Sequence, residues 1–277
     1  MKKYSISLCL CAIGLFLAFA CKKSNSGNNS SIAASSYLSS VVFYGPSYRT
    51  VDSFCYDNTH LLDTFTQTSY DSLTTPYFYD SLSVRFIYQG QNIFPSSYYY
   101  YLYESTGWNY ADYHQLSYDG QGRISEDSSL SDTGTVSYYS YPNNNITIIE
   151  LPEGNVQGNN RDTFYITNGN VSSYSSYAFV PPLPYDLQQA YLQYTYTSVA
   201  NPAYHAAVAG TFGPLLNHLT SYTDFLSKNA YDHLTSTQFS SPIYIFSIAY
   251  TQTFDNKGRL SKLTGPPGAG SYLFSYY

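Results

Sequence analysis

The chain has 277 residues, of which 35 are tyrosine and only 11% are charged, and its formal net charge is −6. The chain has 12 Lys and Arg residues and 18 Asp and Glu residues, and its few basic residues form no stripe that could bind a phosphate backbone. We therefore expect no nucleic-acid partner. Abundant tyrosine with a single Met and a single Trp is typical of a β-sheet protein.

The first 20 residues have the pattern of an export signal. Two lysines follow Met1, and the apolar run over residues 6–19 is shorter than the roughly 20 residues of a membrane-spanning helix. Ala18-Phe19-Ala20 fits ordinary secretory cleavage, while Cys21 directly after it fits a bacterial lipobox, and both would cut before Cys21. The Ser/Asn/Gly-rich residues 21–36 predict a flexible tether, so we favour an exported lipoprotein that is anchored in the bacterial outer membrane through an acylated Cys21.

Six short stretches of the remaining chain share one pattern, which is clearest over residues 118–124 and 254–260. An aromatic or aliphatic residue opens each stretch, a turn-forming residue follows, and a residue that tolerates left-handed backbone closes the turn of a β-hairpin. Tyr118 and Ile124 would then face each other across two strands. The positions expected to have positive φ hold His60, Asn92, Gly122, Asn145, Asn170 and Gly258.

Six hairpins amount to about a dozen antiparallel strands, more than an open twisted sheet usually carries without curling or closing. We therefore expect residues 37–277 to form a single all-β domain, a large curved antiparallel sheet or a barrel or half-barrel built from consecutive hairpins.

The stretch between the fifth and sixth hairpins departs from this pattern. Prolines in residues 180–185 predict an extended connector, and residues 187–197 predict a strand. Apolar residues at 215, 216, 219, 222 and 226 predict a helix that starts near Gly213 and Pro214. The chain should thus carry one helical insertion around residues 203–229, within the segment 198–235.

The two complete hairpin motifs look like the tyrosine-aspartate repeats of Rhs-type proteins. Together with Asn-Pro-Ala-Tyr at residues 201–204 and Leu-Ser-Lys-Asn at residues 226–229, the whole arrangement more closely resembles a family of Bacteroidetes lipoproteins described as having a porin-like fold. The resemblance covers about residues 40–277 and implies a barrel-like domain displayed in the envelope, with no activity attached. Residues 63–68 and 125–129 lack the lipid-facing apolar alternation of a membrane barrel, which favours a tethered domain outside the bilayer.

The densest aromatic stretch lies at residues 98–113. In a strand, alternate tyrosines share a face, so one set belongs to the core and the other is left to bind sugar rings or flat apolar ligands by stacking. The competing interpretation is that tyrosine serves throughout as an amphipathic sheet residue with a buried ring and a wet hydroxyl. The candidate ligand-binding residues are Tyr99, Tyr101, Tyr103 and Trp108.

Little else in the sequence indicates chemistry. His205, His218 and His233 match no short chelating motif, no Gly-x-Ser-x-Gly elbow is present, and no carboxylate pair has a glycosidase spacing. We expect no catalytic residue, no metal and no cofactor. The favoured function is a non-enzymatic envelope binding module for a glycan or an apolar small ligand. The alternatives are a structural protein that docks other envelope proteins and, third, a hydrolase that uses the histidines of the insertion.

Overall fold

The computed structural model describes residues 37–71, 77–90, 92–104, 109–131, 135–152, 159–179, 186–206, 212–220, 223–239 and 242–277. The described residues form strands and a few short helices. In chain order these are β1 (Leu38–Tyr44), β2 (Tyr48–Tyr56), β3 (Leu62–Asp71), β4 (Tyr77–Tyr88), β5 (Pro95–Glu104), β6 (Asn109–Tyr118), β7 (Ile124–Ser129), β8 (Val136–Asn143), β9 (Ile146–Pro152), β10 (Asn159–Thr167), β11 (Asn170–Phe179), β12 (Asp186–Ala200), α2 (Pro202–Ala206), α3 (Gly213–Thr220), the 3-10 helix η1 (Thr223–Leu226), β13 (Asn229–Gln238), β14 (Tyr244–Ala249), β15 (Thr251–Phe254), β16 (Leu260–Thr264) and β17 (Ser271–Tyr276).

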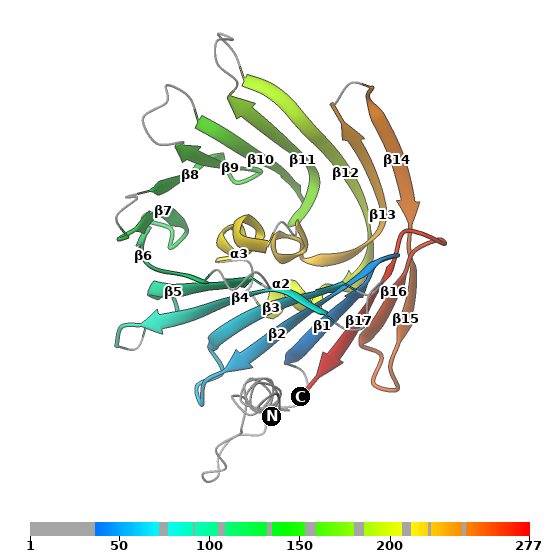
Figure 1. The fold of residues 1–277 in the computed structure, drawn as a ribbon, viewed down its shortest axis with the longest axis horizontal. Coiled ribbons are helices and arrows are strands. Elements are labelled where there is room, and N and C mark those ends of the chain that lie inside the picture. The colour runs from blue at the N-terminus through cyan, green and yellow to red at the C-terminus, as the bar shows by residue number, and fades with distance from the viewer. Residues whose placement is uncertain are drawn as a thin grey trace, which may run out of the picture. The chain divides into compact units, whose positions relative to one another are not determined.

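The strands form a nearly closed antiparallel barrel (Figure 1). Each strand from β1 to β13 pairs with the next one along the chain, as in the β6–β7 pair, where Tyr118 lies opposite Ile124. β15 follows β14 after one residue, Tyr250, and at this point the pairing passes from β13 on one side to β16 on the other. β17 pairs with both β16 and β1, which closes the ring. The barrel of consecutive hairpins expected from the sequence is confirmed.

The helical insertion fills the barrel. Figure 1 shows α2 and α3 inside the ring of strands, and Leu215 and Leu216 on α3 are fully buried. The ring of Phe225 on η1 lies 6.1 Å from that of Phe54 on β2. The insertion is confirmed, but the helix expected to reach residue 226 ends at Thr220, and η1 starts at Thr223. Thr and Ser compete with the helical backbone for hydrogen bonds and favour helix ends.

None of the helices in the described part of the chain is long and apolar enough to cross a membrane.

On strands β3 and β4 the inward-facing row is mostly apolar and the outward-facing row is polar. On the paired strands β3 and β4 the inward row includes Phe65, Leu82, Val84 and Phe86, all of which are buried. The outward row of the same two strands is Thr64, Thr66, Thr68, Ser81, Ser83 and Arg85. This is the reverse of a water-filled membrane barrel, in which the outward row is apolar and the inward row polar.

The Asp and Arg of the complete hairpin motif close its turn and tie it to a neighbouring strand. Asp119 accepts a hydrogen bond from the backbone N–H of Arg123 at 2.9 Å, and the Arg123 guanidinium returns to the Asp119 carboxylate at 2.7 Å. The guanidinium also lies 4.0 Å from the ring centroid of Tyr141 on β8. The second complete motif repeats this arrangement, with Arg259 placed 4.1 Å from the ring centroid of Tyr276.

A positive φ is expected at six turn positions. It is confirmed at His60 (68°), Gly122 (75°) and Gly258 (75°), and it is wrong at Asn145 and Asn170. The φ of Asn92 depends on residue 91, which lies outside the described residues. In the fifth hairpin Asn168 and Gly169 have φ of 54° and 77°, as in a two-residue type I′ turn. The error has a physical cause, since loop length selects the turn type and the copies differ in loop length.

Tyrosines near the hairpin turns hydrogen-bond to the backbone of the preceding strand. In each case the hydroxyl donates to a carbonyl at the first or second residue of the neighbouring strand. These bonds are Tyr88 to Leu62 at 2.8 Å, Tyr118 to Pro95 at 2.6 Å, Tyr141 to Ile124 at 2.9 Å, Tyr196 to Val171 at 2.6 Å and Tyr276 to Leu260 at 2.7 Å. Burial raises the pKa of Tyr276 to about 12. We call these five residues the latch tyrosines.

The six hairpin motifs lie on one end of the barrel. Because neighbouring strands alternate in direction, the turns after β2, β4, β6, β8, β10 and β15 share one rim, which we call the hairpin rim. The described chain also begins there, since the Tyr37 carbonyl accepts a hydrogen bond from the backbone N–H of Tyr277 at 3.1 Å, and the Tyr37 ring stacks on His60. The connection between β13 and β14 lies on the opposite rim.

Candidate ligand-binding surface

Tyr99, Tyr101 and Tyr103 form a row on the outer face of β5, and we call them the tyrosine row. Tyr98, which alternates with them, is fully buried inside the barrel and lies opposite Phe86 of β4. Side chains of neighbouring residues in a strand point to opposite faces, so the tyrosine row points outward. The described residues end at 104 and resume at 109, so Trp108 lies outside them.

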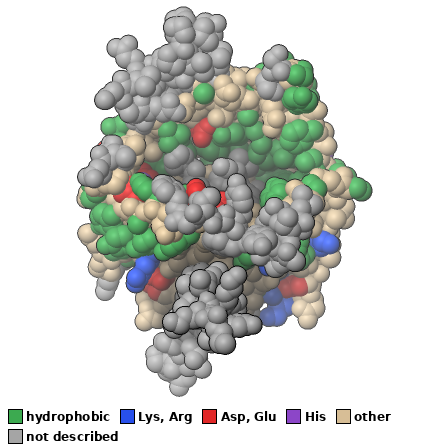
Figure 2. Space-filling model, in the orientation of Figure 1, with side chains coloured by type: hydrophobic (Ala, Val, Ile, Leu, Met, Phe, Trp, Pro, Cys, Tyr) green, Lys and Arg blue, Asp and Glu red, His purple; other side chains and the backbone are tan. Residues whose placement is uncertain are grey.

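The rings of the tyrosine row stand on an open surface. Tyr99 is 39% exposed and Tyr103 is 46% exposed. The rings of Tyr99 and Tyr101 lie 6.1 Å apart with an interplanar angle of 25°, and the Tyr113 ring of β6 lies 5.0 Å from that of Tyr99. Figure 2 shows hydrophobic and tyrosine side chains at the left edge of the molecule, over β5 and β6.

Small and polar side chains flank the row. Ser81, Ser83 and the exposed Arg85 of β4 lie opposite Tyr103, Tyr101 and Tyr99 in turn. Ala111 of β6 lies opposite Tyr101 on the other side. Tyr113 packs against Tyr99, while the small neighbours leave the other ring surfaces of the row accessible, and the guanidinium of Arg85 supplies hydrogen-bond donors beside the row.

A buried polar network lies on the inner face of the same strands. The His114 ring of β6 has Nδ1 2.8 Å from Asp127 Oδ1 and Nε2 3.3 Å from Asp112 Oδ2. It stacks on the Tyr98 ring at 4.5 Å, and the Tyr98 hydroxyl donates to Asp127 Oδ2 at 2.6 Å. Ser129 of β7 donates its hydroxyl to Asp112 Oδ2 at 2.5 Å. We call these five residues the inner network.

The inner network has the features of a structural support rather than of a nucleophilic site. The Ser129 hydroxyl donates to the Asp112 carboxylate rather than to His114, so the geometry differs from that of a Ser-His-Asp triad. Burial opposes ionisation of Asp112, but hydrogen bonds from Ser129, from the Tyr110 hydroxyl and from the Tyr113 N–H hold its pKa below the usual value. A fully bonded network of this kind stiffens the strands that carry it, including β5 under the tyrosine row.

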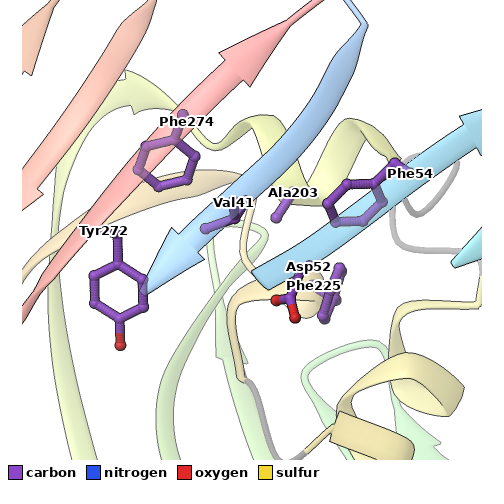
Figure 3. A pocket seen from close by; sticks show the side chains of 7 residues that line it. All are labelled: Val41, Asp52, Phe54, Ala203, Phe225, Tyr272 and Phe274. Carbon is purple, nitrogen blue, oxygen red and sulfur yellow. The ribbon is translucent and has the colours of Figure 1, made fainter. Parts of the chain in front are cut away.

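The cavity beside the insertion leaves little room for a ligand. The cavity in Figure 3 has a volume of about 10 Å³, which is room for a single water molecule. Side chains from β1, β2 and β17 line it together with Ala203 of α2 and Phe225 of η1. The concave inner face of the sheet is therefore occupied by the insertion, and the tyrosine row lies on the convex outer face.

The histidines of the insertion form no cluster that the structure describes. The side chains of His205, His218 and Asp224 lie outside the described residues. His233 is on the outer face of β13, with Nε2 2.7 Å from the Ser247 hydroxyl. Within the described ranges, no group of three or more His, Cys, Asp or Glu side chains is arranged to hold a metal ion. Cys21 also lies outside these ranges.

Comparisons with known proteins bear on the fold alone. No protein-family model matches the chain, and no curated protein matches it. A crystal structure of a porin-like protein from Bacteroides uniformis is similar to this chain with a TM-score of 0.51 and 12% identity, over 88% of this chain and 99% of that one. A crystal structure of a porin-like protein from Bacteroides vulgatus has a TM-score of 0.38 and 10% identity, over 87% of this chain and 99% of that one. The first similarity agrees with the porin-like barrel that the sequence resemblance implies, while no match indicates Rhs-type repeats.

Proposed function

We propose that this chain is a non-enzymatic binding module of the bacterial envelope and that the tyrosine row binds a glycan. The observation that carries the proposal is a row of outward-facing tyrosines on a strand that is paired on both sides, with Tyr99 and Tyr103 exposed and the Tyr99 and Tyr101 rings 6.1 Å apart. The flat faces of sugar rings stack on aromatic faces, while tyrosine hydroxyls and Arg85 are placed to hydrogen-bond the sugar hydroxyls.

The shape of the surface narrows the class of ligand. A convex row of open rings suits an extended chain that lies across it, whereas a small apolar molecule is bound best when most of its surface is buried in a pocket. Because the insertion packs inside the barrel, with Leu215, Leu216 and Phe225 buried there, an extended glycan is favoured over an apolar small ligand.

Binding of linear β-linked oligosaccharides tests this proposal. We expect chitohexaose or cellohexaose to raise the melting temperature of the full chain, since a ligand that binds only the folded state stabilises it. Replacing Tyr99 and Tyr103 by alanine should weaken binding by roughly tenfold for each ring, from about 1–1.5 kcal/mol of lost stacking.

The matched control replaces tyrosines of similar exposure elsewhere on the outer surface. Tyr138 and Tyr165 are 46% and 40% exposed and lie outside the tyrosine row. A control double variant that loses as much affinity as the Tyr99/Tyr103 double variant would mean that binding does not use the row. If the wild type and both double variants bound the glycan with equal affinity, binding would likewise not use the tyrosine row.

We further propose that Cys21 is acylated and tethers the barrel to the outer membrane. The polar outer row of β3 and β4 supports a domain held outside the bilayer, since it offers lipid no apolar band. Mass spectrometry of the mature N-terminus decides this point. An unmodified Cys21, or a first residue other than Cys21, would refute the anchor without touching the glycan proposal.

A further inference from the structure

The β13–β14 hairpin exposes an apolar surface at the rim opposite the hairpin rim. Tyr244, Ile245 and Phe246 on β14 are 56%, 70% and 43% exposed. Figure 2 shows hydrophobic side chains gathered at the upper right, where Figure 1 places the start of β14. Exposed apolar residues that adjoin in this way mark interaction sites. We call residues 244–249 the open edge.

β14 has a strand partner on one side only within the described part of the chain. It pairs with β13 from His233↔Ala249 to Gln238↔Tyr244, and the pairing with β16 begins only at Thr251. The Tyr250 N–H donates to the Asp232 carbonyl of β13 at 2.7 Å. Because the backbone groups of alternate residues point to opposite sides of a strand, Tyr244, Phe246 and Ile248 face β13.

The remaining three residues of the open edge therefore present their backbone outward. Ile245, Ser247 and Ala249 direct their N–H and C=O groups away from β13, toward the side on which no described strand lies. Such a row is a template for another strand, and proteins normally block it with a charge, a proline or a bulge. The open edge contains none of these, and the β13–β14 pairing has no register shift.

We propose that the open edge pairs with the open edge of a second copy of this chain. The absence of charge supports a self-association, because residues 234–254 contain no Asp, Glu, Lys or Arg and two copies meet there without repulsion, although the chain as a whole carries −6. A partner of opposite charge has nothing to recognise on this segment.

The open edge is also complementary to itself. In an antiparallel pair centred on Ser247, the large Ile245 lies opposite the small Ala249 of the other copy, and the two serines face each other. Each of the three residues with outward backbone then exchanges hydrogen bonds with its partner. On the opposite strand face, Phe246 of one copy lies beside Ile248 of the other. The two hairpin rims point in opposite directions in this dimer.

Light scattering and sedimentation of the purified full chain, in a mild detergent, test the proposal. We expect a concentration-dependent dimer that Ile245→Lys weakens by roughly tenfold or more, because a buried charge at a strand edge blocks pairing. Ile245→Val keeps a β-branched apolar residue and should keep the dimer. Ser275→Lys puts the same charge on the outer face of β17, which is paired on both sides, and should leave the dimer intact.

Several results would overturn the proposal. The chain could be monomeric at all concentrations, or Ile245→Lys could dimerise like the wild type, which would place the contact elsewhere. A monomer that binds lipid vesicles in an Ile245-dependent way would assign the edge to a membrane surface instead.

Amide hydrogen exchange provides an independent readout. The N–H groups of Ile245, Ser247 and Ala249 should become protected only at concentrations at which the chain dimerises. Those of Phe246 and Ile248, which face β13, should be protected at every concentration. Fast exchange at all three outward positions in a dimeric sample would refute the strand pairing.

Discussion

Replacing His114 by alanine should remove a hydrogen-bond partner from two buried carboxylates. The Asp112 and Asp127 side chains are 2% and 3% exposed, and the His114 ring nitrogens lie 3.3 Å and 2.8 Å from their oxygens. Losing a hydrogen-bond partner of a buried charged group typically costs about 1.5–3 kcal/mol. The lost stacking of the imidazole on Tyr98 adds roughly 0.5–1.5 kcal/mol, so we expect a total loss of about 2–4.5 kcal/mol.

The direction in which stability changes with pH follows from the pKa of Asp112. In the wild type the pKa of Asp112 is lowered by its hydrogen bonds, so its contribution to stability is present above the unfolded value near 3.9 and is lost as the pH falls through the lower folded value. In the variant the hydrogen bonds from Ser129, from the Tyr110 hydroxyl and from the Tyr113 N–H remain, so the pKa of Asp112 stays below its usual value. Acid should therefore destabilise the variant as it destabilises the wild type.

Urea unfolding between pH 4 and pH 7, followed by circular dichroism, measures both effects through the midpoint and the slope. His233→Ala is the matched control, because that histidine lies on the outer face and its loss should change the free energy of unfolding by about 0.5 kcal/mol or less. A loss below about 1 kcal/mol for His114→Ala, or a variant that acid stabilises, would refute the hydrogen-bond account of the inner network.

Three further predictions concern the turns and the latch tyrosines. Gly122→Ala should lower the free energy of unfolding by about 1–2 kcal/mol, because φ is 75° at this position. Gly120→Ala in the same turn should be close to neutral, because there is open space around Gly120. Thermal melts of the two variants test this difference. Tyr88→Phe should cost about 1–1.5 kcal/mol, since a backbone carbonyl loses its hydrogen bond, while Tyr138→Phe, on an exposed side chain, should cost nothing measurable in denaturant unfolding. The pKa of Tyr276 is raised to about 12 in the folded state, so its protonated form stabilises the fold below pH 10. This contribution to stability should disappear between pH 10 and about pH 12. An alkaline unfolding series that is unchanged by Tyr276→Phe would contradict this prediction.

The sequence by itself determined the strand pairs and the turns between them. Turn chemistry is local, because the Asp119 side chain bonds to its own backbone and to Arg123 only four residues away. The alternation of outward Tyr99, Tyr101 and Tyr103 with inward Tyr98 follows from the period of two in any strand. These features depend on neighbours along the chain, so they can be derived from residue order. The errors at Asn145 and Asn170 arose where loop length, rather than residue type, selects the turn.

Only the tertiary structure decided which face of β5 is buried, what fills the barrel and where a strand lacks a partner. His114, Asp112 and Asp127 come from two strands, and the pairing of β6 with β7 brings them together. The insertion enters the barrel because Leu215, Leu216 and Phe225 find apolar partners there, which a helical periodicity alone cannot locate. The open edge of β14 exists because β16 ends at Thr264, before it reaches the residues that pair with β13. Such facts depend on contacts between segments far apart in the chain, and so on the closed ring of strands as a whole.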